Sequence, residues 1–436
     1  MAHEPGPTVS LAAATPQTVV ADVRSAPNVR KTVFVARQPI FDAAKDLYGY
    51  ELLFRSGLDN VYDALHSDTS TLDVIANSLL VIGLDELAGG RRVFINFTRN
   101  LLVKGVADLL PADRVALEIE KACEPDEDVL AACERLKSLG YVLALDAFTR
   151  DDPRRPLLPF ADIVKVDFLT ALGRERSQII RSLAGTPVQA LAERVETVAA
   201  FDEAAACGYT FFQGYFFSKP IIRSGSRLAA CKLNHLRMLD QINRPELSYD
   251  ELEAIIKHDV ALVYSLLKFI NSAWFGLRYP ITSIKHALIL LGPKEVGKWY
   301  ALVALRLMAS DKPHELLLRC MTRAKMAEAL APACGLKGEA PQLFLVGLFS
   351  VIDALLDAPM ADVLAHLPLD DRIKAALLGE PCPYRSVHDT LLAYEQGDWA
   401  TFSACARALN LDESLVADAY TQSLRWSHEA FTLGAF

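Results

Sequence analysis

The chain has 436 residues, with 54 acidic against 45 basic side chains, and hydrophobic residues make up 52% of it. This length and apolar content predict two or three globular domains and argue against a disordered protein. The net charge of −9 is shared by both halves, so no nucleic acid polymer is expected as a partner. A small anionic ligand stays compatible with this charge, because a local basic pocket can lie in an acidic protein.

The N-terminal segment and the cysteines narrow the class further. Residues 1–30 lack the compact apolar core of a signal peptide, and no run of 18 apolar residues occurs anywhere in the chain. We therefore expect a flexible tail at residues 1–30, no membrane insertion and a cytoplasmic protein. The eight cysteines contain no C-x-x-C pair, which disfavours structural zinc and a disulfide framework.

Residues 31–224 are predicted to form a (β/α) barrel. Helical segments such as 71–87 and 126–139 alternate with strand-like runs at 33–40, 47–55, 91–97, 114–120, 141–148, 161–168, 188–194 and 211–220. Eight strand candidates with intervening helices suit a compact barrel. An open, doubly wound α/β sheet is the alternative that this alternation leaves open.

Residues 225–436 are predicted to form an all-helical domain. Ser248 and Glu251 have the spacing of a capping box and predict a helix start. Apolar residues then repeat every three to four positions over 255–270 and 284–291, and the second pattern should stop at Gly292-Pro293. Trp274, Phe275 and Tyr279 are expected to pack in the core or between domains.

Polar residues at the ends of the predicted strands suggest a site. In a (β/α) barrel the carboxyl ends of the strands converge on one mouth, and chemistry is placed there. Carboxylates and an amide around one point suit Mg²⁺ or Mn²⁺, although each residue taken singly suits a salt bridge or a turn equally well. The residues in question are Glu51, Asn96, Glu118, Asp146, Asp167 and Glu193.

The order of these residues resembles the EAL family of cyclic di-GMP phosphodiesterases over about residues 33–220. The family's Glu-Ala-Leu signature with a following arginine reads Glu51-Leu52-Leu53 with Arg55 here, and Gln38-Pro39-Ile40 is similar to its QPI segment. The resemblance implies metal ligands, nucleotide-binding residues and catalytic residues. These are Glu51, Asn96, Glu118 and Asp146 for metal, Gln38, Arg55 and Gln213 for the nucleotide, and Lys165 and Glu193 for catalysis.

The sequence departs from this family where a second metal would be held. Two adjacent aspartates in the family correspond to Asp146-Ala147 here, and alanine offers no oxygen. Lys121 stands where a glutamate braces the neighbouring loop, and that loop is replaced by a segment with two prolines. Asp151 or Asp152 could substitute only if this loop, which we expect to be flexible, placed one of them at the metal. The departures predict a degenerate, catalytically inactive site that is vestigial or holds one metal.

The second half resembles the HDOD domain, a helical relative of the HD phosphohydrolases that lacks their metal ligands. The similarity lies in Asn271-Ser272-Ala273, Phe275-Gly276, Ile281-Thr282-Ser283-Ile284 and Leu290-Leu291-Gly292. His258-Asp259 has no further histidines grouped near it in the sequence, which argues against a working metal site. HDOD domains are thought to act through protein contacts, so the resemblance implies other signalling proteins as partners.

The two resemblances together predict a bacterial EAL-HDOD signalling protein without phosphodiesterase activity. Because Gln38, Arg55, Lys165, Glu193 and Gln213 are retained, binding of cyclic di-GMP without turnover is left open, as is a pure receptor role. An active, metal-dependent phosphodiesterase that converts cyclic di-GMP to pGpG is the alternative. No cofactor is certain from the sequence, and Mg²⁺ or Mn²⁺ fits the EAL-like residues.

Overall fold

The computed structural model describes residues 33–56, 83–218, 248–257, 260–272, 275, 277–309, 312–365, 367 and 369–432. Several predictions fall outside these residues: the tail at 1–30, the domain boundary at 224/225, most of the helix at 71–87, His258-Asp259 and Trp274. Within the described part of the chain, no helix combines the length and apolar character needed to cross a bilayer.

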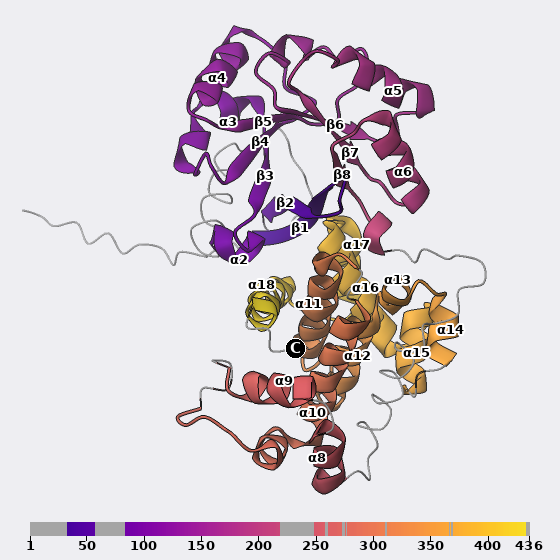
Figure 1. Cartoon of the computed structure of the whole chain (residues 1–436). Coiled ribbons are helices and arrows are strands. Elements are labelled where there is room, and N and C mark those ends of the chain that lie inside the picture. The colour runs from indigo at the N-terminus through magenta and orange to yellow at the C-terminus, as the bar shows by residue number, and fades with distance from the viewer. Residues whose placement is uncertain are drawn as a thin grey trace, which may run out of the picture. The chain divides into compact units, whose positions relative to one another are not determined.

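Eight strands close into a barrel in chain order (Figure 1). They are β1 (Val33–Asp42), β2 (Leu47–Ser56), β3 (Arg92–Phe97), β4 (Val115–Ile119), β5 (Val142–Leu145), β6 (Ile163–Asp167), β7 (Gln189–Glu193) and β8 (Phe211–Gln213). β1 runs antiparallel to its neighbours β2 and β8, and the other neighbouring strands are parallel. The barrel prediction is confirmed, because the β1–β8 pairing leaves no open edge.

Helices lie on the outside of this barrel (Figure 1). They are α2 (Leu84–Ala88), α3 (Arg99–Val103), α4 (Glu127–Ser138), α5 (Gly173–Ser182) and α6 (Val198–Cys207), with short 3₁₀ turns η1 (Val106–Leu109), η2 (Arg155–Leu157) and η3 (Phe216–Ser218). α4 shows how the sequence dictates them. The Asp126 side chain accepts a hydrogen bond from the Val129 amide, and Val129, Cys133 and Leu136 form one buried face.

The described part of the second half is helical, as predicted. Its helices are α8 (Tyr249–Lys257), α9 (Val260–Ile270), α10 (Ile284–Met308), α11 (His314–Leu330), α12 (Ala340–Phe349), α13 (Ile352–Leu356), α14 (Met360–Ala365), α15 (Asp371–Leu378), α16 (Pro383–Gln396), α17 (Trp399–Ala408) and α18 (Glu413–Thr432), with the turn η5 (Lys337–Glu339). α11 and α12 approach closely at Gly347 of α12. A Cβ added there would lie 2.4 Å from the backbone nitrogen of Ala324 in α11, so only glycine fits at this position.

The local signals in this half can be checked against the structure. The Ser248 amide donates to Glu251 Oε2 at 2.9 Å and the Glu251 amide to Ser248 Oγ at 3.3 Å, which confirms the capping box. Gly292 has non-helical torsions (φ 74°), which confirms the predicted break, although helical residues continue on both sides as α10. Phe275 packs edge-on against Phe269, with ring centroids 5.1 Å apart. The core prediction for Tyr279 was wrong, since its exposed fraction is 80%.

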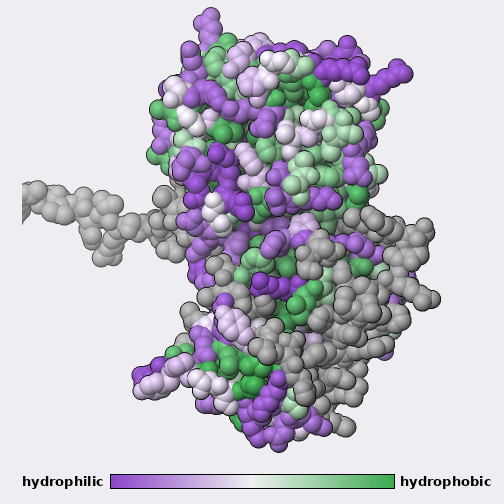
Figure 2. Space-filling model, in the orientation of Figure 1, coloured by the Kyte–Doolittle hydropathy of each residue, from purple (hydrophilic) through white to green (hydrophobic). Residues whose placement is uncertain are grey.

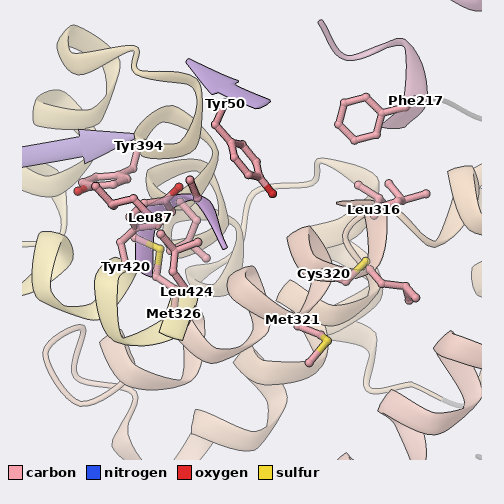
Figure 3. Close-up of a cluster of buried hydrophobic side chains, with 14 of the residues drawn as sticks. Tyr50, Leu87, Phe217, Leu316, Cys320, Met321, Met326, Tyr394, Tyr420 and Leu424 are labelled. Carbon is pink, nitrogen blue, oxygen red and sulfur yellow. The ribbon is translucent and has the colours of Figure 1, made fainter. Parts of the chain in front are cut away.

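One hydrophobic core runs from the barrel into the helices. The same buried cluster contains Phe34 and Tyr50 of the barrel and Tyr394 and Phe402 of the helical half. Figure 3 shows part of it, with Tyr50 and Leu87 among side chains of the helices. On the face seen in Figure 2, hydrophilic and hydrophobic residues are interspersed over the barrel half. The described barrel strands and the helices therefore belong to one compact unit.

Candidate metal and nucleotide site

A polar layer lies directly above an apolar layer inside the barrel. The apolar layer contains Ile40, Phe94, Ala116, Ala144, Ile163, Leu191 and Phe211. Side chains alternate between the two faces of a strand, so the residue two positions away points inward again. One polar residue therefore lies in or directly after each strand: Gln38, Glu51, Asn96, Glu118, Asp146, Lys165, Glu193 and Gln213.

Lys165 lies at the centre of this layer. Its Nζ is 2.7 Å from Glu118 Oε1, 2.8 Å from Glu193 Oε1, 3.0 Å from Glu51 Oε2 and 3.7 Å from Asp146 Oδ1. The lysine and Glu118 are fully buried, whereas the Asp146 side chain is 28% exposed. One ammonium group thus faces four carboxyl groups, so a further positive charge bound at this site would be stabilised.

The pKa values of these groups follow from burial and crowding. Burial and the neighbouring charge of Glu51 raise the pKa of Glu118 well above its usual range. Burial raises the pKa of Glu193 to about 7, against the opposing effect of Lys165. Burial would also raise the pKa of Glu51, but Lys165 and the hydrogen bonds around it lower it overall. A carboxyl group held this far above its usual range is electrically unsatisfied, and a cation would favour its ionised form.

Amide side chains orient Glu51 within the layer. Asn96 Nδ2 donates to Glu51 Oε1 at 3.2 Å, and Gln213 Nε2 donates to Glu51 Oε2 at 2.6 Å. Gln213 Nε2 also lies 3.0 Å from Gln38 Oε1. The structure therefore brings eight of the predicted residues together around one centre.

Two candidate residues lie away from this centre. Arg55 is 8% exposed and donates to Ser403 Oγ of α17 at 2.9 Å, with Glu413 Oε2 of α18 at 3.4 Å. Asp167 pairs with Arg194 at 3.1 Å and accepts from the Leu169 amide, which makes it a loop-stabilising residue. β2 carries Arg55 on the same face as Glu51 but four residues further along the strand.

The loop after Asp146 is held by a buried ion pair. Ala147 has a left-handed backbone (φ 45°) and brings no oxygen to the site. Both Asp152 oxygens are taken by Arg154, whose Nη1 donates to the Ile119 carbonyl at 3.0 Å and whose Nη2 donates to the Asp146 carbonyl at 2.6 Å. The expectation of a flexible loop was wrong, because this pair is almost fully buried and ties the loop to the ends of β4 and β5.

Neither aspartate of this loop replaces the missing ligand. The Asp152 oxygens are engaged by Arg154, and the Asp151 side chain is 92% exposed. Lys121 is exposed, so it does not brace the loop. Sequence reasoning missed Arg154 as the residue that fixes Asp146, and no spacing in the sequence indicates this role.

The donor set suits a hard divalent cation. Glu51, Asn96, Glu118 and Asp146 offer the carboxylate and amide oxygens that Mg²⁺ and Mn²⁺ prefer. The buried Glu118 oxygens complete no hydrogen bond, and Lys165 meets them only as an ion-pair partner. With Lys165 between the carboxylates, no three acidic, histidine or cysteine side chains among the described residues already converge as ligands. Metal binding here would therefore move these side chains away from Lys165.

The match to known families agrees with this site. Residues 21–220 match the EAL domain and residues 231–362 match the HDOD domain. The chain belongs to the family of proteins that join an EAL barrel to an HDOD domain, which confirms both resemblances seen in the sequence.

Individual relatives share nearly the whole chain. It is 33% identical to YuxH, an uncharacterized protein of Bacillus subtilis, over 404 residues that cover 91% of this chain and 98% of YuxH. It is also 33% identical to the cyclic di-GMP phosphodiesterase CdgJ of Vibrio cholerae, over 91% of this chain and 93% of CdgJ. A solved structure, Klebsiella pneumoniae BlrP1 with calcium and cyclic di-GMP, is 22% identical with a TM-score of 0.37, covering 44% of this chain and 56% of BlrP1.

Proposed function

We propose that this protein is a cytoplasmic bacterial signalling protein whose barrel, residues 31–224, binds cyclic di-GMP without hydrolysing it at an enzyme's rate. Its helical domain, residues 225–436, would pass the state of the barrel to other signalling proteins. The name of the relative CdgJ supports cyclic di-GMP as the ligand. The polar layer supports a ligand site at the mouth, where the carboxyl ends of the strands meet.

The proposed loss of catalysis rests on one observation, Ala147 in place of a second aspartate. Two-metal hydrolases hold their ions about 4 Å apart, to generate hydroxide and to stabilise the leaving oxygen. Here Asp146 is followed by a methyl group, and Asp152 is held by Arg154. A second ion would therefore lack the carboxylate that should compensate its charge.

Binding of the dinucleotide is a separate matter from turnover. Four carboxyl groups around Lys165 repel a phosphate diester unless a cation joins them. With Mg²⁺ or Mn²⁺ held by Glu51, Asn96, Glu118 and Asp146, phosphate oxygens gain a cationic partner. Gln38 lies at the edge of the same layer, and its amide would donate to the ligand in place of the Gln396 carbonyl. Gln213 orients Gln38 and Glu51 from within the layer.

Hydrolysis assays with the full chain test the proposal. Purified protein with Mn²⁺ should release no pGpG above the level of the Glu51→Ala variant. Ala147→Asp should create turnover, because it restores a carboxylate beside Asp146. Calorimetry with calcium should show binding of cyclic di-GMP to the wild type and not to Glu51→Ala. Absence of binding with every cation would remove the receptor role.

An active phosphodiesterase is the second candidate, and the activity for which the relative CdgJ is named favours it. In that case one ion is held tightly by the polar layer, and a second is held weakly by other oxygens. Wild-type turnover that Glu51→Ala abolishes, with little gain from Ala147→Asp, would establish this candidate instead.

A further inference from the structure

The helical half is docked on one edge of the barrel mouth. Gln38, Leu53 and Arg55 lie along this edge on β1 and β2. Leu53 and Arg55 lie on the face of β2 that carries Glu51, further from the centre of the polar layer. Each of the three residues contacts the segment from the end of α16 to the start of α18.

The turn between α16 and α17 contacts the inner part of this edge. Gln38 Nε2 donates to the Gln396 carbonyl at 3.1 Å. Gly397, with φ 69°, lies against Leu53 so closely that an added Cβ would be 2.5 Å from Leu53 Cδ1 and 3.4 Å from Leu53 Cβ. Only a residue without a side chain fits this approach without displacing the leucine.

α17 and α18 contact the outer part of the edge through Arg55. Its Nη1 donates to Ser403 Oγ, and Glu413 places a buried carboxylate 3.4 Å away. The guanidinium also lies over the ring of Phe34, with 5.3 Å between its carbon and the ring centroid. Phe34 packs in turn against Trp399 and Phe402. A guanidinium is the group best suited to hold a phosphate, and here the helical half holds it.

A chain of hydrogen bonds joins this contact to the polar layer. It runs from the Gln396 carbonyl through Gln38 to Gln213, and from Gln213 to Glu51. Glu51 contacts Lys165 at 3.0 Å. Any ligand that rearranges Glu51 or takes up the Gln38 amide therefore disturbs the position of the α16–α17 turn.

We infer that an anionic dinucleotide at the barrel mouth and the docked helical half compete for the same side chains, Gln38 and Arg55. This inference rests on the proposed binding of cyclic di-GMP. Ligand binding then releases Gln38 from the Gln396 carbonyl and Arg55 from Ser403 and Glu413, and shifts the α16–α17 turn relative to the barrel edge. By linkage, whatever holds the helical half in place weakens ligand binding by the same factor.

An engineered disulfide tests the competition. The Cβ separation of 3.4 Å between positions 53 and 397 lies close to the usual range of about 3.5–4.5 Å for disulfides. In the full-length double variant Leu53→Cys, Gly397→Cys, oxidation should lock the edge, and calorimetry with cyclic di-GMP and calcium should show at least about tenfold weaker binding. Reduction should restore it. Oxidised wild type controls for the native cysteines, and Gly379→Cys, at the matching end of α15, controls for the φ strain.

The outcomes separate this inference from the proposed function. Equal affinity in the fully cross-linked and the reduced protein would overturn the competition and leave nucleotide binding intact. Failure of the two cysteines to cross-link under oxidant would show that the surfaces do not meet, and would overturn it as well. No binding by wild type with any cation would reject the proposed function, and this inference with it.

A charge variant gives an independent reading that does not need the cross-link. Glu413→Gln removes the carboxylate that competes with phosphate for Arg55, so cyclic di-GMP should bind several-fold more tightly. Glu86→Gln is the matched control, because Glu86 pairs with Arg425 across the same two halves at 2.7 Å but does not contact Arg55. An equal change in both variants would mean that general loosening, and not competition at Arg55, alters the affinity.

Discussion

Two buried clusters of charged side chains in this molecule are built in opposite ways. At the barrel mouth, Lys165 alone faces four carboxyl groups. In the helical half, Glu395 Oε1 forms an ion pair with Arg319 Nε at 2.5 Å and Glu395 Oε2 accepts from Arg323 Nε at 2.6 Å, so each oxygen of this carboxylate is matched by a guanidinium group. A cluster with excess acid needs a cation or protons, whereas the carboxylate of the matched cluster already has a cationic partner on each oxygen. The difference supports the ligand binding that we propose for the first cluster and indicates a structural role for the second.

The strongest way to break the matched cluster is Glu395→Ala. The change leaves Arg319 and Arg323 buried without their shared carboxylate, and should lower the free energy of unfolding by about 4 kcal/mol. Urea denaturation of the full chain measures this, and Mn²⁺ should not restore the loss. A loss below about 1 kcal/mol would mean that water reaches these arginines.

Lys165→Met should destabilise the folded protein at the barrel mouth, and a bound cation should restore most of the lost stability. Without the ammonium, the carboxyl groups repel one another, and the unfolding free energy in EDTA should fall by about 3 kcal/mol. Millimolar Mn²⁺ should recover much of this, because an ion bound only by the folded state stabilises it. A thermal unfolding scan that shows no Mn²⁺ effect would contradict the charge imbalance assigned to this site.

His388 allows a test of the matched cluster by pH. Burial lowers the pKa of His388 to about 3, helped by Arg323 and Arg385 and opposed by Glu395. Below pH 6.5 the unfolded chain binds a proton that the folded histidine does not, so stability falls as the pH drops; at pH 5 the loss is about 2 kcal/mol. His388→Phe should remove that loss, because neither ring nitrogen makes a hydrogen bond. His286→Phe, at an exposed histidine, is the control.

The smallest effect is expected for Glu86→Gln. This residue and Arg425 form an ion pair between α2 and α18, with side chains 33% and 53% exposed. Solvent screens such a pair, so the unfolding free energy should change by less than about 1 kcal/mol. A change as large as that for Glu395→Ala would remove the distinction between exposed and buried pairs in this protein.

The sequence predicted the barrel and most of the polar layer because both follow from local patterns. Apolar runs with one polar residue near each end mark eight strands, and alternation along each strand places those residues on one inner face. Glu118 and Glu193 could be found in this way. On β6 the same pattern selected Asp167, and Lys165 was predicted only by the resemblance to the EAL family. Arg55 lies on the correct face as well, but nothing in its neighbourhood predicts Ser403 and Glu413 as partners.

Long-range pairing explains the other misses. Arg154 fixes the Asp146 loop through carbonyl groups on two different strands, and a carbonyl has no signature in a sequence. Tyr279 stands among apolar residues and was expected to be covered, yet 80% of it is exposed. Periodicity tells which face of an element is apolar, and it does not tell whether a second element covers that face.

The shared hydrophobic core has a practical consequence for anyone who divides this chain. A fragment that ends at Ser218 would keep all eight strands but lose the rings of Trp399 and Phe402, which cover Phe34. It would also lose Glu315, whose carboxylate accepts a hydrogen bond from the Tyr50 hydroxyl at 2.6 Å. Exposed aromatic residues on the first strand favour aggregation. Activity or binding measured on an isolated barrel would therefore describe a damaged molecule, and the uncut chain is the smallest piece whose chemistry can be interpreted.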